Sequence, residues 1–151
     1  MFQRDHLTVK SELTVLNYIQ EWFRQFCLER GSRLTWLKNQ LYPLNLALAE
    51  GFTNAVRHAH HELPKDTQID IDLALWDDRI EIRIWDHGKP FDPNAIEEPE
   101  PGTRRLGGYG WFLLRRLADR VSYERSHDGR NCLVIVKQDL VASTSSQGVR
   151  R

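Results

Sequence analysis

Two polar side chains, a carboxylate and a carboxamide, stand four residues apart in the stretch AEGFTNAVRHAH, residues 49–60. The stretch is typical of a helix, so Glu50 and Asn54 share a face about one turn apart. A glutamate there can accept a proton from an attacking hydroxyl or water, and an asparagine oxygen is a suitable Mg²⁺ ligand beside phosphate oxygens. The same spacing is also typical of a solvated helix face, so the pair alone leaves both interpretations open.

Asp86 ends a row of core-facing residues. In the stretch RIEIRIWD the side chains alternate, so Ile80, Ile82 and Ile84 share one face and Asp86 comes next on it. An unpaired buried charge is costly, so this carboxylate requires a partner, and the amino group of a ligand would supply one. Gly88 would permit the close approach of a ring or a backbone. The alternative is that the strand ends there and Asp86 caps a turn.

A glycine-rich loop leads directly into a helix in LGGYGWFLLRRL, residues 106–117. The free N–H groups and the positive helix end near Gly108 and Gly110 suit a phosphate. The pattern is neither a P-loop nor a dinucleotide fingerprint, because no strand immediately precedes it. On its own it is also typical of a flexible turn into a helix.

Two helices are expected in the first part of the chain, and the second of them carries Glu50 and Asn54. The run that starts at Ser11 has a helical period, with Ser11 as its N-cap, and the next helix is secure after Pro43, which suits a first helical position. Their apolar stripes comprise Val15, Leu16, Ile19, Trp22, Phe23 and Phe26 in the first helix, and Leu44, Leu48, Phe52 and Val56 in the second. Glu50 and Asn54 lie on the side opposite the second stripe, so they face solvent or a cleft.

The rest of the chain changes to a period of two. We expect a short strand at residues 6–9, a hairpin of residues 69–76 and 79–86, and a final hairpin with strands at 121–124 and 131–138. Residues 87–107 contain four of the six prolines, which predicts an irregular lid. This order predicts an α+β two-layer sandwich with helices on one face of a mixed, mostly antiparallel sheet. We expect one domain over residues 1–140 and a disordered tail over 141–151.

The overall composition disfavours several classes of protein. The 151 residues fit one domain, and the 21 basic and 21 acidic residues cancel, whereas a nucleic-acid binder would be expected to have a basic excess. Cys27 and Cys132 form no CxxC pair and suit a reducing cytosol. The first residues lack a secretory signal, and no apolar run has the length of a membrane span. We therefore expect a cytoplasmic protein with no membrane partner.

The three motifs, in this order, resemble the nucleotide site of the superfamily that contains gyrase, a heat-shock chaperone, mismatch-repair ATPases and sensor histidine kinases. Within it, LALAEGFTNAVRHA, WDHGKPFDP and GGYGWFLLRRLADRV are most similar to the anti-sigma-factor serine/threonine protein kinases of the switch-kinase type. The resemblance spans about residues 6–138 and implies a Bergerat-type ATP-binding fold. It further implies a homodimer that uses Mg-ATP to phosphorylate an anti-sigma-factor antagonist and that binds a sigma factor.

The resemblance also implies a role for each motif residue. Glu50 would be the general base and Asn54 the Mg²⁺ ligand, while Asp86 would bond the adenine amino group and Gly88 would line the base pocket. The residues that would contact the phosphates of ATP are Arg104, Arg105, Gly108 and Gly110. The two arginines are equally typical of a solvated pair on a loop.

The sequence departs from the family pattern in the turn before the last strand. Family members have a glycine-threonine turn there whose threonine approaches the nucleotide, whereas this chain has Arg130, Asn131 and Cys132. Asn131 is a candidate substitute, which leaves that contact open. His87 and Lys89 also add polar bulk on either side of Gly88.

Two other functions remain as alternatives. One is a binding module that sequesters a partner and holds ATP as a structural ligand or not at all; the intact Glu50 favours the kinase, because such a module needs no base. The other is the ATP-binding half of a histidine kinase, which requires a dimerising helical hairpin for which the chain leaves no space.

Trp76 and Trp85 lie on the face opposite the isoleucine rows, either open to a dimer contact or shielded by long neighbours.

Overall fold

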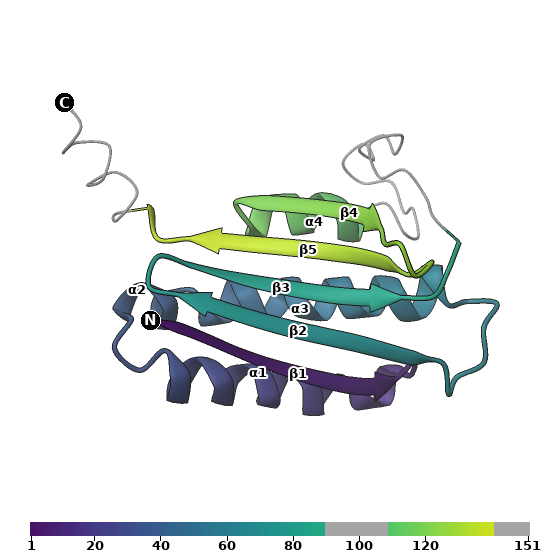
Figure 1. Ribbon diagram of the computed structural model, residues 1–151, viewed down its shortest axis with the longest axis horizontal. Coiled ribbons are helices and arrows are strands. Elements are labelled where there is room, and N and C mark those ends of the chain that lie inside the picture. The colour runs from purple at the N-terminus through teal and green to yellow at the C-terminus, as the bar shows by residue number, and fades with distance from the viewer. Residues whose placement is uncertain (90–108, 141–151) are drawn as a thin grey trace.

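The computed structural model describes residues 1–89 and 109–140, and their architecture is a five-stranded sheet with helices on one of its faces (Figure 1). The strands are β1 (Phe2–Lys10), β2 (Gln68–Trp76), β3 (Arg79–Asp86), β4 (Arg120–Arg125) and β5 (Asn131–Gln138). The helices are α1 (Leu16–Arg30), α2 (Thr35–Asn39), α3 (Leu41–Asn54) and α4 (Tyr109–Leu117), with the short turns η1 (Leu13–Val15) and η2 (Ala55–Ala59). The predicted α+β two-layer fold is therefore confirmed.

The sheet has the strand order β1-β2-β3-β5-β4. We predicted a mixed, mostly antiparallel sheet. Each of the pairings among the described strands is antiparallel. The predicted hairpin is present, with Ile71 opposite Ile84 and Leu75 opposite Ile80. The first strand is longer than the four residues that we predicted, because it pairs with β2 along its whole length of nine residues.

The core lies between the inner face of the sheet and the helices. The alternating residues of β2 and β3 and the apolar stripes of α1 and α3 are at most 4% exposed at the positions Ile69, Ile71, Leu73, Leu75, Ile80, Ile82, Ile84, Ile19, Phe23, Phe26, Leu44, Leu48 and Phe52. Val56, Trp22, Val15 and Leu16 are partly buried against this cluster. Burial of each large side chain stabilises the fold by about 1.5–3 kcal/mol, so the predicted periodicities account for the main layers.

The starts of both long helices differ from the prediction. Ser11 does not cap a helix: α1 begins at Leu16 after the turn η1, and the buried Ser11 side chain contacts His60 instead. α3 begins at Leu41, two residues before Pro43. Proline is tolerated in a first helical turn because the first four N–H groups of a helix have no partner within the helix.

Two tryptophans on the outer face of the sheet are covered by neighbouring arginine side chains. The guanidinium of Arg79 lies 3.9 Å from the ring of Trp76, and that of Arg130 lies 4.5 Å from the ring of Trp85. Of the two interpretations left open for these tryptophans, shielding by long neighbours is the one that the structure supports.

Within the described part of the chain, no helix has the length and apolarity needed to cross a membrane.

Candidate functional site

The first turn of α4 brings three of the predicted site residues together. A Cβ atom built on Gly110 would lie 3.1 Å from Oε2 of Glu50 and 3.1 Å from Oδ1 of Asn54. Both α3 side chains are half-buried, so this face of α3 is covered by α4 rather than open to solvent. The helix face that the sequence left unassigned therefore lies against the N-terminal end of another helix, where a phosphate group is favoured.

Asp86 lies at the end of β3 with its side chain buried, at 3% exposure. Its Oδ1 accepts hydrogen bonds from the Gly88 backbone N–H at 2.9 Å and from Nδ2 of Asn131 at 2.8 Å. Its Oδ2 accepts a bond from the Tyr123 hydroxyl at 2.8 Å. The turn-capping interpretation is thus correct for the Gly88 contact, and two side chains from β4 and β5 hold the same carboxylate.

Asn131 is fully buried and lies directly opposite Asp86 in the β3–β5 register. Besides its bond to Asp86, its Nδ2 donates to the Gly88 carbonyl oxygen at 2.9 Å. Asn131 therefore lies beside both residues of the predicted base pocket. The strand pairing explains this position, since the first residue of β5 faces the last residue of β3.

Tyr123 is the residue of this cluster that sequence reasoning missed. Burial raises the pKa of its phenol, and the neighbouring Asp86 carboxylate acts in the same direction, so the phenol stays protonated and donates to Asp86. The signal that could have identified it is the alternation of β4. Val121 and Tyr123 share one face of that strand, and both pack against the main core.

A cavity of about 360 Å³ adjoins Gly88, within the size range of small-ligand sites. It lies between the residues that follow α3 and those that follow β3, and is lined by His58, Ala59, His61, Glu62, Leu63, His87, Gly88, Lys89 and Arg125. This lining includes His87 and Lys89, which the sequence marked as unusual neighbours of Gly88. The cations Lys89 and Arg125, together with three histidines, outnumber the single carboxylate of Glu62, so the lining favours an anionic ligand.

Gly88 is in close contact with the end of the α3 helical segment. A Cβ atom built on it would lie 2.2 Å from the carbonyl oxygen of Ala59, whereas a Cβ on Gly110 would meet only side-chain ends, at 3.1 Å or more. We therefore expect Gly88→Ala to lower the free energy of unfolding by about 1–3 kcal/mol, as overpacking against backbone does. Thermal denaturation followed by circular dichroism measures this, with Gly110→Ala as the matched control that changes stability little. Equal stability of the two variants would contradict the contact.

The remaining predicted residues lie outside the described part of the chain. These are Arg104, Arg105 and Gly108, together with most of the predicted lid at 87–107 and the predicted tail at 141–151. The single-domain boundaries of 1–140 likewise stay a prediction.

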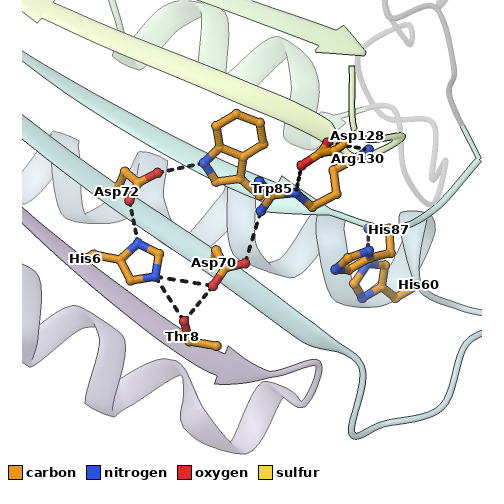
Figure 2. A network of polar contacts seen from close by, with 9 residues as sticks. All are labelled: His6, Thr8, His60, Asp70, Asp72, Trp85, His87, Asp128 and Arg130. Carbon is orange, nitrogen blue, oxygen red and sulfur yellow. Dashed lines mark hydrogen bonds and ion pairs between the residues drawn. The ribbon is translucent and has the colours of Figure 1, made fainter. Parts of the chain in front are cut away.

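A separate polar network crosses the outer face of the sheet (Figure 2). It joins β1, β2, β3 and the β4–β5 turn through His6, Thr8, Asp70, Asp72, Trp85, Asp128 and Arg130. Hydrogen bonding to Asp72 is the main cause that raises the pKa of His6, and two bonds from Arg130 lower the pKa of Asp128 to about 2. Among the described residues, no group of three or more histidine, cysteine, aspartate or glutamate side chains forms a metal site. The network lies on the face of the sheet away from the helices, and its hydrogen bonds join neighbouring strands.

Comparison with known proteins agrees with the fold. The chain is 32% identical over 105 residues to the serine-protein kinase RsbW of Oceanobacillus iheyensis, which covers 64% of this chain and 66% of that protein. It is 32% identical over 115 residues to the serine-protein kinase RsbW of Halalkalibacterium halodurans, and the match covers 71% of this chain and 68% of that protein. The chain thus spans about two thirds of the length of these curated relatives.

Two solved structures share the fold. The RsbU and RsbW domains of a Mycobacterium tuberculosis protein align with a TM-score of 0.63 at 15% identity, over 90% of this chain and 32% of that one. The SiaB–SiaC complex of Pseudomonas aeruginosa aligns with a TM-score of 0.56 at 12% identity, over 88% of each chain. The family described as the histidine kinase-like ATPase domain matches residues 10–137, well over half of the 151-residue chain. The chain therefore belongs to the histidine kinase-like ATPase domain family.

Proposed function

We propose that this chain is an ATP-dependent serine/threonine protein kinase that phosphorylates an anti-sigma-factor antagonist and binds a sigma factor in the cytoplasm. The observation that carries the proposal is the approach of Glu50 and Asn54 to Gly110, at the N-terminal end of α4. A base, a metal-binding oxygen and a phosphate-binding helix end then lie within one small region. The similarity to serine-protein kinases RsbW supports the reaction class.

The residues present fit ATP and Mg²⁺. Asn54 offers one neutral oxygen, which suits an ion that takes most of its ligands from water and phosphate oxygens. Mg²⁺, when bound, supplies neutralisation of charge on the phosphates. The start of α4 would hold those phosphates together with Gly108, Arg104 and Arg105, and Asp86 with Gly88 would hold the adenine.

Glu50 would act on the protein substrate. Its carboxylate would accept the proton of a serine or threonine hydroxyl as that oxygen attacks the terminal phosphorus of ATP, in line with the phosphorus–oxygen bond to the β-phosphate, which breaks and releases ADP. The phosphate added to the antagonist would then repel it electrostatically from the kinase. Release of the product would free the chain to hold a sigma factor.

The second candidate function is a binding module without kinase activity. The observation in its favour is that Asp86 already accepts three hydrogen bonds from the protein, so its burial is satisfied without a ligand. Its Oδ2 accepts one of these bonds and retains a lone pair for an adenine amino group, so either candidate can bind ATP. The feature that favours the kinase is Glu50 beside Gly110, because a binding module needs no base.

The deciding experiment is to incubate the full chain with Mg-ATP and candidate antagonists from the same organism. Mass spectrometry of each antagonist should locate one phosphoserine or phosphothreonine, and the modified antagonist should bind more weakly than the unmodified one. Only autophosphorylation, or plain ATP hydrolysis with every candidate, would favour the binding module.

Asn54→Ala should weaken ATP binding only when Mg²⁺ is present. Loss of one metal ligand is expected to reduce affinity about tenfold, which corresponds to about 1.4 kcal/mol. Calorimetry in Mg²⁺ and in EDTA measures the difference, with the wild-type protein run in parallel. An equal loss of affinity in both buffers would show that Asn54 contacts the nucleotide by another route.

We also propose that the chain acts as a homodimer. Light scattering at tens of micromolar should give about twice the mass of 17.8 kDa. A strict monomer over that concentration range would count against the dimer.

A further inference from the structure

The helical segment that carries Glu50 and Asn54 ends in a widened turn. Residues Ala55–Ala59 form the π turn η2, closed by a bond from the His60 N–H to the Ala55 carbonyl oxygen at 2.8 Å. Such turns are rare in proteins, and those that occur are often found at functional sites. This one leaves His60 only 3% exposed, while His58 and His61 on either side are exposed. A buried histidine at this position requires an explanation.

The ring of His60 connects three segments that are distant in the sequence. Its Nδ1 lies 3.1 Å from the Ser11 hydroxyl, at the end of β1, and its Nε2 lies 2.7 Å from the backbone nitrogen of His87, after β3 (Figure 2). A backbone N–H can only donate, so Nε2 must be unprotonated and accept. The proton of the neutral ring is then on Nδ1, where it is donated to Ser11.

The backbone group that His60 holds belongs to the turn of the nucleotide site. His87 lies between Asp86 and Gly88, and the Gly88 N–H donates to Asp86 at 2.9 Å. Gly88 also packs directly against Ala59, the residue before His60. The ring of His60 and the carboxylate of Asp86 therefore both hold the same short turn, through the backbone N–H groups of His87 and Gly88.

We propose that His60 is a positioning residue for the nucleotide site, whose neutral ring holds the turn at His87 and Gly88, and whose protonation weakens nucleotide binding. This inference rests on the proposed function, in which Asp86 and Gly88 hold the adenine. A protonated ring would direct an N–H group at the His87 N–H, so the bond would be replaced by repulsion between two donors. The turn would then move away from the helix end, and Gly88 would lose its fixed position beside Asp86, which Asn131 and Tyr123 still hold.

The surroundings of the ring favour the neutral form. Burial lowers the pKa of His60 below 6.5; the Asp86 carboxylate opposes this shift, and His87 adds to it. Other titratable or charged groups nearby face the adjoining cavity, namely His58, His61, Glu62, Lys89 and Arg125. Because the folded-state pKa is depressed, the contribution of the ring to stability is complete above about pH 6.5 and is lost as the pH falls through the lowered value.

The test compares ATP affinity at pH 7.5 and pH 5.0 by calorimetry in two proteins. His60→Gln keeps an acceptor oxygen for the His87 N–H and does not titrate. The ratio of the wild-type affinity to that of His60→Gln should fall about 3- to 10-fold between the two pH values, since each unit of coupled pKa shift changes affinity tenfold. The titration of ATP itself and of the exposed histidines cancels in this ratio.

Two further variants separate the effect from general destabilisation. His6→Gln removes a histidine on the outer face of the sheet and should follow the wild type at each pH. His60→Leu removes the acceptor and should bind ATP weakly even at pH 7.5. If His60→Leu fails to fold, the comparison of the wild type with His60→Gln still decides. Parallel affinities of these two proteins from pH 7.5 to 5.0 would overturn the proposal.

Nuclear magnetic resonance distinguishes failure of this inference from failure of the proposed function. The amide signals of His87 and Gly88 in the wild type, without nucleotide, should shift with the titration of the His60 ring, and this part of the shift should be absent in His60→Gln. If neither protein binds ATP at pH 7.5, the proposed function is wrong and with it the effect on nucleotide affinity. Amide signals that do not respond to the His60 titration would overturn the positioning role itself.

Discussion

Glu50→Gln is expected to lower phosphoryl transfer to the antagonist by about 10²–10⁴-fold while ATP still binds. Glutamine keeps the shape and the hydrogen-bonding reach of the side chain but cannot take the proton of the attacking hydroxyl. The side chain points at the first turn of α4, where a Cβ on Gly110 would lie 3.1 Å from Oε2, so the proposed proton acceptor lies at the proposed phosphate site. Loss of the acceptor should therefore lower the rate constant of the transfer step and leave nucleotide affinity unchanged.

The measurement is single-turnover transfer of labelled phosphate at saturating Mg-ATP, with ATP affinity measured separately by calorimetry. Glu29→Gln is the matched control, because it makes the same change of charge on the exposed end of α1. Transfer by Glu50→Gln at the rate of this control would remove the general-base role. A parallel loss of ATP affinity would instead assign Glu50 to nucleotide binding.

The parts of the fold that were predictable are those set by local periodicity. A strand period of two fixes which residues face the core, and this placed Asp86 on the inner face of β3, where it is buried. A helical period likewise placed Glu50 and Asn54 together on the side of α3 away from its core stripe. Periodicity gives the face of an element but not the element that covers it. The approach of α4 through Gly110 was therefore visible only in the structure.

The parts that were not predictable depend on contacts between distant segments. Ser11 has the residue type and the local sequence of an N-cap, yet its hydroxyl bonds to the ring of His60, 49 residues away. Tyr123 reaches Asp86 across 37 residues. A side-chain hydrogen bond of this kind leaves no periodic signal, and local capping preferences are weak enough for tertiary contacts to override them. The role of Asn131 was open for the same reason, until strand pairing placed it beside Asp86.

The contacts of Asp86 also change which substitution tests its role. The sequence alone suggests that Asp86→Ala would abolish nucleotide binding and leave the fold intact. In the structure the carboxylate accepts hydrogen bonds from Gly88, Asn131 and Tyr123. Each buried donor left without a partner lowers the free energy of unfolding by about 1–3 kcal/mol. Asp86→Ala is therefore expected to destabilise the protein as well, so a loss of binding in that variant would have two causes.

Asp86→Asn separates these causes and is expected to reduce ATP affinity by about 10- to 100-fold with a small change in stability. The amide oxygen can keep the bonds from Gly88 and Asn131, and the Tyr123 hydroxyl can rotate to accept from the new NH₂ group. That NH₂ group would face the adenine amino group, so two donors would meet where a donor and an acceptor met before. Calorimetry with ATP and thermal denaturation measure the two effects, and Asp77→Asn in the β2–β3 turn makes the same charge change as a control. Unchanged ATP affinity in a folded Asp86→Asn protein would show that the buried carboxylate holds the turn and does not read the base.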